Sequence, residues 1–403
     1  MSELWRDEDL EQRFFALTAL LQQSQQFWRY HAFKYLQLPW ESEFPELSQQ
    51  LRALSYADAE QLSRDDAALI DFLGKHLPMF LALENVCAIG DFNVEPLPIL
   101  PEPRDVPGRK WQQIRHFAPC VPENNFAVLE WCSGKSHLGR VLANRRTSEV
   151  IALERDAKLI AAGKIQAARE HATIDFHCVD AMTAAAANVL QKNHNAIALH
   201  ACGDLHVQLL QLCAQKQTQT ITLAPCCYQL IADASRYVLS QTARASGLQL
   251  QHDDLRTAVH GTVTSSPRLN RQRRQLQAWR LGFDLLQREL RSMDAYLPTP
   301  ALSTTILQTS FVDFCLKVAT HHHWQLPSGI DYSYFERAGS ERLREVTALD
   351  LPRIAYRRAL ELWLALDRAL FLREHNYAVA VGLFCEHALT PRNILIRAEY
   401  LVS

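Results

Sequence analysis

The chain has 403 residues, a formal net charge of -2 and ten cysteines. This length exceeds one average domain and predicts two or three compact units, with enough apolar residues for their cores. The balanced charge excludes a protein that binds polyanions over its whole surface, so any nucleic-acid surface is expected to be a local patch.

The N-terminal segment MSELWRDEDLEQRFF carries acids where a signal peptide would carry basic residues. No uninterrupted apolar run is long enough to span a bilayer. The cysteines do not form CxxC pairs and are too sparse for a disulfide scaffold, so we expect reduced thiols. These observations predict a cytoplasmic protein without a membrane partner, and they leave its oligomeric state open.

Helical patterning dominates the first part of the chain, where apolar residues recur at three- and four-residue spacings. We predict a helical N-terminal region over residues 1–95. The segment EPLPILPEPRDVPG then contains five prolines, which remove backbone donors and disfavour helix in the residue before them. This predicts a proline-rich linker over residues 96–118.

The apolar period changes after this linker, because short strand-like runs alternate with helical stretches. The pattern predicts a βαβ series over residues 119–250 and therefore a doubly wound, Rossmann-like α/β sheet. Ligands of such sheets bind beyond the carboxyl ends of the strands, so those ends should line one crevice. The predicted strands are FAVLEW, EVIALE, IDFHCVD, NAIALHACGD and TITLAPCC.

Residues 251–374 return to helical patterning and predict a helical insertion. Its segment RLNRQRRQLQAWRLGFDLLQREL has one apolar face and one basic face. The basic face either contacts phosphates or is merely solvated, and its candidate substrate-binding residues are Arg268, Arg271, Arg273 and Arg274. Residues 375–403 contain the strand-like runs YAVAVGLF and NILIRAEY around the turn-prone LTPRN, which predicts a C-terminal β-hairpin completing the sheet.

The turn after the first predicted strand narrows the choice of ligand. A P-loop needs a glycine five positions before Gly134, but Leu129 stands there, and a dinucleotide turn would want GxGxxG. The S-adenosylmethionine turn has the form [DE]xGxGxG. Its four fixed positions coincide with Glu130, Cys132, Gly134 and Ser136. The turn therefore predicts S-adenosylmethionine as the cofactor.

Acids at the next two strand ends suit the same cofactor. Glu154 can accept hydrogen bonds from both ribose hydroxyls, and Asp180 can accept one from the adenine amino group. Lys110 either lines the mouth of the crevice as a substrate contact or is a solvated linker lysine. The full set predicted to bind the cofactor is Glu130, Cys132, Gly134, Lys135, Ser136, Glu154, Asp180, Ala181 and His200.

The segments HACGD and PCCY stand at the ends of the last two predicted strands of the α/β region. Glycine, aspartate and proline in them indicate a backbone that turns into the crevice. Asp204 or His200 could orient or deprotonate a nucleophile there. A soft metal is the alternative use of the cysteines, but adjacent cysteines rarely both bind one zinc and no CxxC pair is present, so no metal is predicted. The predicted catalytic set is His200, Cys202, Asp204, Cys226, Cys227 and Tyr228.

Five motifs in this order resemble a class I methyltransferase-like family. They are EWCSGKSHLGR, ALERD, FHCVDAMT, ALHACGDL and APCCY, and the tail ALTPRNILIRA resembles the family's closing LxPRNxxI segment. The family carries a GKGxL turn, a HxCGD strand end and a later Cys-Cys pair. It includes proteins named for similarity to rRNA adenine dimethylases and is similar to a eukaryotic tRNA ribose 2′-O-methyltransferase.

The resemblance implies a class I methyltransferase sheet, S-adenosylmethionine as cofactor and an RNA acceptor, either tRNA or rRNA. It does not imply N6-adenine methylation, since the Asn-Leu-Pro-Tyr type motif of the rRNA adenine dimethylases is replaced here by residues 200–204. A protein acceptor stays open. So does a non-catalytic RNA- or protein-binding module, because Cys132 and Ser136 stand where the turn usually has glycine.

Overall fold

A computed structural model describes residues 3–98, 105–145, 148–261 and 266–401. Residues 99–104 of the predicted linker lie outside the described residues. The chain divides into two compact units. Unit 1 consists of Met1–Gln23, Asn85–His260 and Arg357–Ser403, and unit 2 of Ser24–Glu84 and Gly261–Tyr356.

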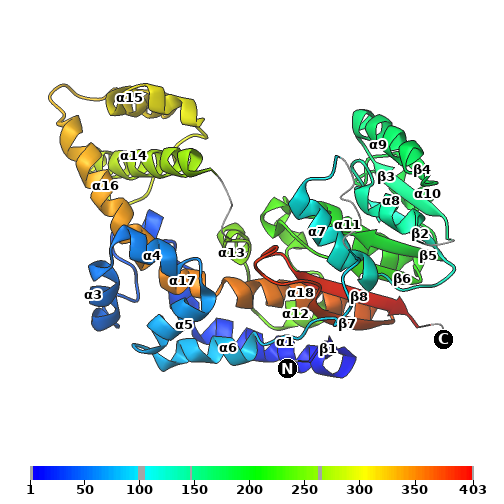
Figure 1. Ribbon diagram of the computed structural model, residues 1–403. Coiled ribbons are helices and arrows are strands. Elements are labelled where there is room, and N and C mark those ends of the chain that lie inside the picture. Colours follow the sequence, from blue (N-terminus) through cyan, green and yellow to red (C-terminus); the bar gives the residue numbers. More distant parts are fainter. Residues whose placement is uncertain (1–2, 99–104, 146–147, 262–265, 402–403) are drawn as a thin grey trace. The chain divides into compact units, whose positions relative to one another are not determined.

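An eight-stranded sheet forms the centre of unit 1, in the order β1-β7-β8-β6-β5-β2-β3-β4 (Figure 1). The five strands from β2 to β6 are mutually parallel where they pair, as the alternation of strands and helices predicts. Their bounds are β2 Ala127–Trp131, β3 Val150–Glu154, β4 Asp175–Cys178, β5 His194–Ala198 and β6 Thr220–Leu223. Every residue of β5 and β6 is buried, including the polar side chains of His194, Asn195, Thr220 and Thr222.

The predicted C-terminal hairpin is confirmed and completes the sheet. Strand β7 (Tyr377–Leu383) pairs antiparallel with β8 (Ile394–Tyr400). Strand β8 also pairs antiparallel with β6, so the last strand of the chain lies between β6 and β7. The sheet is therefore parallel except around this last strand and at its β1 edge.

Three segments of unit 1 differ from the predicted boundaries. A two-residue strand, β1 (Trp5–Arg6), pairs with β7, so the first residues of the chain belong with the sheet. Helix α7 (Gly108–Phe117) occupies the second half of the predicted linker. Helix α18 (Arg357–Glu374), expected within the insertion, packs against β7 and β8 and is buried along almost its whole length.

Helices cover the sheet of unit 1. On one face, Trp111, Ile114 and Phe117 of α7 join a core with Val128 of β2 and Val150 of β3. Helix α1 packs against α18, and α18 packs against the strands of the hairpin. The remaining helices of this unit are α1 Asp7–Gln23, α8 His137–Ala143, α9 Ala157–Arg169, α10 Ala186–Val189, α11 Asp204–Lys216, α12 Gln241–Ala245 and α13 His252–Ala258.

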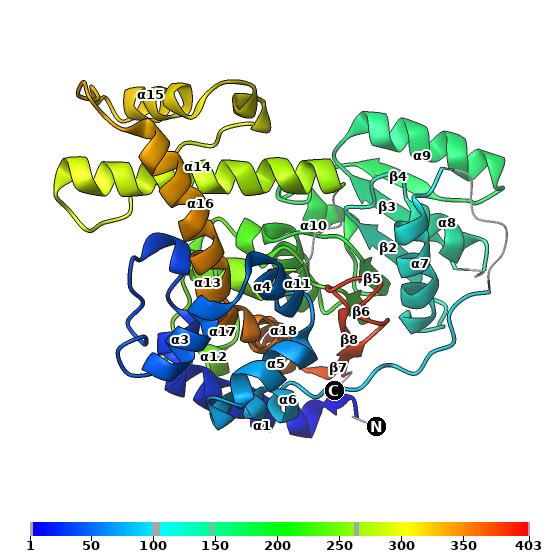
Figure 2. The ribbon, with the colours of Figure 1, turned by 60° about the vertical axis from the view of Figure 1, so that its left-hand side comes forward.

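Unit 2 is helical, and its main feature is helix α14 (Pro267–Arg291), which α16 (Tyr332–Leu349) crosses (Figure 2). The predicted apolar face is confirmed at Leu276, Trp279, Phe283 and Leu286, which join a core with α15 (Phe311–His321). Leu290, predicted on the same face, is exposed. The other helices are α2 Gln25–Trp28, α3 Pro45–Ala53, α4 Tyr56–Leu62, α5 Asp66–Gly74, α6 Ala82–Val86 at the border of the units, and α17 Leu351–Ala355.

Short 3-10 turns connect several of these helices. They are η1 Ala32–Lys34, η2 Pro78–Leu81, η3 Ala118–Cys120, η4 Tyr228–Leu230, η5 Ala234–Arg236 and η6 Thr304–Gln308. Among the helices in the described part of the chain, none combines the length and the apolar character that a membrane span requires.

Candidate functional site

A pocket of about 260 Å³ opens beyond the carboxyl ends of the parallel strands in unit 1. Its wall contains residues that directly follow or end β2, β3 and β4, together with the segment after β5 and one residue after β6. The sequence predicted a crevice at this edge, and the structure confirms it. The lining residues are Cys132, Leu153, Glu154, Arg155, Val179, Asp180, Ala181, Met182, Cys202, Asp204, Leu205 and Leu230.

The turn after β2 keeps the backbone of a glycine-rich turn, although only one of its three glycine positions holds glycine. Cys132, Gly134 and Ser136 have φ angles of 56°, 59° and 53°. Such left-handed conformations cost a non-glycine residue roughly 1 to 2 kcal/mol. The two substituted positions therefore hold a backbone geometry that their side chains disfavour, so the surrounding structure must stabilise it.

A buried carboxylate supplies that stabilisation. Oε2 of Glu130 accepts hydrogen bonds from the Ser136 hydroxyl at 2.5 Å and from the Gly139 backbone N–H at 3.0 Å. A Cβ atom on Gly139 would lie 2.2 Å from the Ser136 hydroxyl oxygen and 2.7 Å from this carboxylate, so only glycine fits there. Burial raises the pKa of Glu130 to about 7, against the lowering effect of the Ser136 bond.

Glu130 and Ser136, both predicted to bind the cofactor, hold the turn from beneath in this structure. Both side chains are buried beneath the turn, and neither lines the pocket. The physical reason is strand alternation: Val128 and Glu130 point to the same face of β2, and that face packs on α7 and α8. Gly134 and Lys135 are half-buried in the turn but do not line the pocket either.

Glu154 ends β3 at the pocket wall and joins the two neighbouring turns. One carboxylate oxygen accepts from the Gly134 N–H at 2.9 Å, and the other accepts from the Arg155 and Asp156 N–H groups at 2.9 and 3.0 Å. A carboxylate has about four acceptor positions, so capacity for a ligand hydroxyl remains. Glu154 is thus fixed in direction by its own turn while it faces the pocket.

Asp180 lies beside it, two residues beyond the end of β4. Its Oδ1 accepts from the Met182 N–H at 2.9 Å, and its Oδ2 lies 3.9 Å from the Arg155 guanidinium. Ala181 is buried and lines the same wall. The structure therefore brings together four of the residues predicted to bind the cofactor, namely Cys132, Glu154, Asp180 and Ala181.

Lys110 lies near two histidines, His137 and His200, whose protonation its charge opposes. His137 is buried, and its Nδ1 lies 2.6 Å from a guanidinium nitrogen of Arg140. Burial first and the charge of Lys110 second lower the pKa of His137 to about 4. His200 is exposed, yet the protein atoms around its ring and the charge of Lys110 lower its pKa to about 4. Both imidazoles are neutral at physiological pH.

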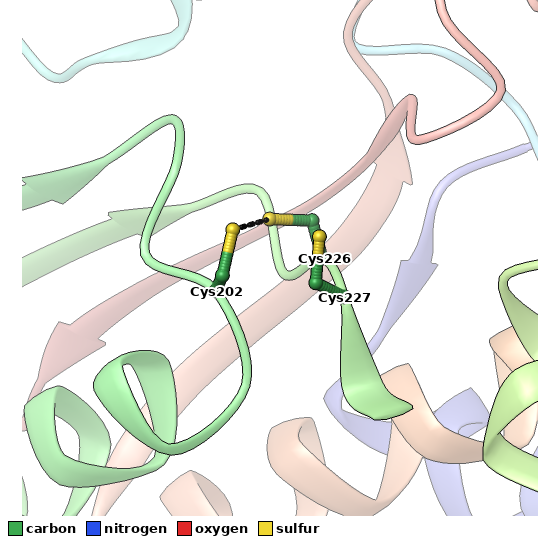
Figure 3. A group of neighbouring side chains, drawn as sticks. All are labelled: Cys202, Cys226 and Cys227. Carbon is green, nitrogen blue, oxygen red and sulfur yellow. Dashed lines mark hydrogen bonds between the residues drawn. The ribbon is translucent and has the colours of Figure 1, made fainter. Parts of the chain in front are cut away.

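Three thiols meet where the segments after β5 and β6 run side by side. The Sγ atoms of Cys202 and Cys226 are 3.5 Å apart, and the Sγ atoms of Cys202, Cys226 and Cys227 all lie within 4.8 Å of one another. Figure 3 shows the sulfur atoms of Cys202 and Cys226 facing each other, with the sulfur of Cys227 beside them. All ten cysteines are free thiols, as the sequence predicts.

The three thiols share hydrogen bonds and have unequal acidities. The bond with Cys202 holds the pKa of the Cys227 thiol well below its ordinary value, with smaller help from Cys226, Arg392 and His200. The bond with Cys202 likewise raises the pKa of the Cys226 thiol. One negative charge is thus favoured on the cluster, at Cys227.

The backbone between the two segments fixes this arrangement. Cys202 and Cys226 form an isolated parallel bridge, and the Gly203 N–H donates to the Cys226 carbonyl at 3.2 Å. Gly203 has φ 56° and ψ -123°, a conformation that glycine adopts readily. A Cβ atom there would lie 2.6 Å from the carbonyl carbon of Leu230, so the two segments approach too closely for any side chain.

Asp204 makes two contacts with the part of the chain after β6. Its Oδ1 pairs with Arg236 at 2.9 Å, and its Oδ2 accepts from the Ala232 N–H at 2.9 Å. Both oxygens hold the segment that follows the two adjacent cysteines, although Asp204 also contributes to the pocket wall. We therefore assign Asp204 a positioning role.

Tyr228 lies in the core and not at the reacting end where the sequence predicted it. Its side chain is 0% exposed, and burial raises its pKa. The guanidinium of Arg368 on α18 lies 5.2 Å from the ring centroid, and His206 meets the ring edge-on. Tyr228 thus anchors the segment after β6 to α18 and cannot touch a substrate in this conformation.

The comparisons with known proteins concern mainly this α/β region. Residues 109–234 match a family described as "Methyltransferase domain". This stretch is a methyltransferase domain. Together with the strand order and the antiparallel last strand, the match gives the predicted Rossmann-like class I methyltransferase fold. The chain therefore carries the domain of an S-adenosylmethionine-dependent methyltransferase.

Solved structures show only distant likeness to the chain. A tRNA (uracil-54, C5)-methyltransferase from Pyrococcus abyssi, crystallised with S-adenosyl-L-homocysteine, is 15% identical over 32% of each chain, with a TM-score of 0.26. A TehB-like SAM-dependent methyltransferase from Corynebacterium glutamicum is 13% identical over 38% of this chain and 82% of that one, with a TM-score of 0.22.

Coclaurine N-methyltransferase, bound to N-methylheliamine and SAH, is 11% identical over 95% of this chain and 99% of its own, with a TM-score of 0.28. The chain spans about a third of the length of the first of these structures. No curated protein matches the sequence. These superpositions carry no argument about the acceptor.

Several residues of the domain's pocket escaped the sequence analysis. Apolar side chains account for most of them: Leu153, Val179, Met182, Leu205 and Leu230. They give the pocket the apolar surface that an aromatic ring requires. Leu153 and Val179 adjoin the predicted acids along the chain, so the strand ends themselves could have indicated them, whereas Leu230 is placed by the long-range approach to Gly203.

Proposed function

We propose that the chain transfers the methyl group of S-adenosylmethionine to an RNA acceptor, either tRNA or rRNA. The proposal that S-adenosylmethionine is the donor rests on one observation: Glu154 and Asp180 converge on one pocket beside the turn after β2. Two carboxylate acceptors at adjacent strand ends, with apolar residues between them, match the polar edges and apolar ring of an adenosine.

Each pocket residue has a role in this proposal. Glu154 accepts from the ribose hydroxyls and Asp180 from the adenine amino group, while Leu153 and Met182 contact the ring. When bound, S-adenosylmethionine would supply an activated methyl group to the acceptor atom, and S-adenosylhomocysteine would be released. Catalysis is mainly the positioning of an already activated donor against the acceptor.

We assign the proton-accepting role to His200 and not to Asp204. His200 is exposed, neutral near pH 7, and close enough to Lys110 for that charge to lower its pKa. Lys110 is half-buried on α7 and can contact an acceptor anion there. Asp204 already uses both oxygens in the contacts with Arg236 and Ala232.

The RNA part of the proposal draws on the first turns of α14 and on the motifs that resemble RNA-modifying enzymes. The segment from Pro267 to Arg280 contains five arginines and no acid. Arg268, Arg271, Arg273 and Arg274 are exposed. Arg274 is partly engaged, because its guanidinium lies 4.0 Å from the ring centroid of Tyr56 and 3.7 Å from Glu60. Arg268 and Arg271, which lie one helical turn apart, are therefore the more informative pair for a test of RNA binding.

The experiment incubates the full chain with methyl-labelled S-adenosylmethionine and separate RNA and protein fractions from cells that lack it. We expect label in RNA. Label in protein alone would replace the RNA acceptor with a protein, and no label in any fraction, together with no donor binding, would favour the non-catalytic module.

A matched pair of double variants tests the basic helix. Arg268→Gln with Arg271→Gln should lower the slope of log affinity for RNA against log salt by about 0.7 per lost phosphate contact. The control combines Arg64→Gln with Lys75→Gln, which removes the same charge from exposed residues that already pair with Glu60 and Asp71. Equal slopes for the two double variants would contradict a role of α14 in RNA binding.

A further inference from the structure

We propose that Cys202, Cys226 and Cys227 form a three-thiolate site for a thiophilic divalent metal ion of the zinc class. Among the residues that the structure describes, this is the one group of three or more candidate ligands with all donor atoms in mutual reach. The inference goes beyond the proposed methyl transfer and does not depend on it.

The sulfur positions suit a tetrahedral ion. Zinc–sulfur bonds of about 2.3 Å in tetrahedral geometry place two ligand sulfurs about 3.8 Å apart. The Cys202 and Cys226 Sγ atoms are 3.5 Å apart, and all three Sγ atoms lie within 4.8 Å of one another. Movements of less than an ångström are therefore enough to surround one ion.

Adjacent cysteines normally cannot share an ion, because successive side chains of an extended segment point to opposite sides. This objection led the sequence analysis to predict no metal. Cys227, however, has a left-handed backbone with φ 51° and ψ 45°. That conformation breaks the alternation and leaves the sulfurs of Cys226 and Cys227 on the same side as Cys202 (Figure 3).

A left-handed cysteine costs roughly 1 to 2 kcal/mol, so the surrounding structure must hold it. The residue before Cys227 is held by the bridge between Cys202 and Cys226. The residue after it, Tyr228, is held by the burial of its ring. Further along the same segment, Asp367 of α18 accepts from the Leu239 and Ser240 N–H groups at 3.0 and 2.9 Å. The thiols thus sit on a preorganised support.

Soft thiolates select zinc-like ions over magnesium or calcium. Three protein ligands are also the number found in zinc sites that keep a fourth position open for water or a substrate. A disulfide between Cys202 and Cys226 would use two of the three thiols and leave the placement of Cys227 unexplained. The convergence of all three favours the metal.

The test uses the full chain without a histidine tag, freed of metal by a chelator and kept reduced. Titration with Zn²⁺ should show one tight equivalent with release of protons from the thiols. Co²⁺ should give thiolate-to-metal charge-transfer bands that one equivalent of Zn²⁺ abolishes. Each of C202S, C226S and C227S should weaken Zn²⁺ binding by roughly 100-fold or more.

The matched control is C178S, which removes an exposed thiol that donates to the Arg155 carbonyl and lies outside the cluster. It should bind Zn²⁺ as the wild type does. In case a cluster variant fails to fold, the wild type is alkylated with and without Zn²⁺, and its peptides are mapped by mass spectrometry. We expect protection of the three cluster cysteines but not of Cys178.

Three results would overturn the proposal. They are absence of a tight equivalent in the wild type, Zn²⁺ binding that survives all three cluster substitutions, and alkylation of the cluster that Zn²⁺ does not slow. A Cys202–Cys226 disulfide in chain purified under reducing conditions would likewise replace the metal site with a redox pair.

Discussion

The turn after β2 and the segment after β5 face the same pocket, but different kinds of interaction hold them. The β2 turn rests on the buried carboxylate of Glu130, which binds the Ser136 hydroxyl and the Gly139 N–H. The β5 segment rests on backbone fit, since Gly203 bonds to Cys226 and lies against Leu230. The first support should therefore respond to pH, and the second to added side-chain volume.

The largest effect is expected for Gly203→Ala. The new Cβ would meet the Leu230 backbone at 2.6 Å in a conformation that alanine disfavours, so we expect a loss of roughly 3 kcal/mol or more in the free energy of unfolding. Gly247→Ala is the control, because Gly247 also has a positive φ of 76° but would meet nothing within 4 Å.

The control should lose only about 1 kcal/mol, the cost of the left-handed backbone alone. Urea unfolding measures both variants. Equal losses would mean that the approach of Gly203 to Leu230 does not constrain the segment, and the proposed contrast between the two supports would fail.

A pH-dependent effect is expected for Glu130→Gln. Glu130 has a pKa of about 7 in the folded chain and 4.5 as its ordinary value, so its proton is held more tightly after folding. The resulting stabilisation is fully present below pH 4.5 and is lost as the pH rises to about 7. Glutamine mimics the protonated acid, so the Glu130→Gln variant keeps this stabilisation at all pH values.

The wild type should therefore lose up to about 3 kcal/mol relative to Glu130→Gln between about pH 5 and pH 7.5. Urea unfolding at both pH values gives this double difference. Glu149→Gln, at an exposed acid just before β3, should show no such dependence. A Glu130→Gln difference that stays constant with pH would show that the carboxylate is not desolvated as described.

The smallest effect is expected for Cys132→Gly. Glycine relieves the left-handed strain at φ 56° but adds conformational entropy to the unfolded chain, so the two terms nearly cancel. The free energy of unfolding should stay within about 1 kcal/mol of the wild type. A loss well beyond that value would reveal an interaction of the Cys132 thiol that the present account does not include.

Local sequence patterns predicted the parallel strands and the acids at their ends, because a buried strand and its terminus are encoded by neighbouring residues. The amino-acid pattern could not place α18 or β1. Helix α18 packs against β7 and β8, and β1 pairs with β7, but neither the charge nor the size of the residues indicates these remote partners. Helix α7 was not predicted, because the five prolines indicated a linker over the whole of residues 96–118.

The same distinction applies to the site. The positions of Glu154 and Asp180 in the pocket wall were predictable because the strand ends of such sheets line one crevice. Glu130 was expected at the pocket because its position in the motif outweighed the strand alternation that turns it towards α7. The contacts of Asp204 with Arg236 and of Tyr228 with Arg368 could not be predicted, because only the folded chain reveals these partners.

The most direct test of the central claim is calorimetric titration of the full chain with S-adenosylmethionine. We expect one binding site in the wild type. Glu154→Ala should weaken binding by about 10- to 100-fold, since a charge-assisted hydrogen bond is worth roughly 1.5 to 3 kcal/mol. Glu149→Ala, at an exposed acid just before the same strand, should bind as the wild type does. Absence of binding in the wild type, or equal affinities of the two variants, would contradict a methyl-donor site at the end of β3.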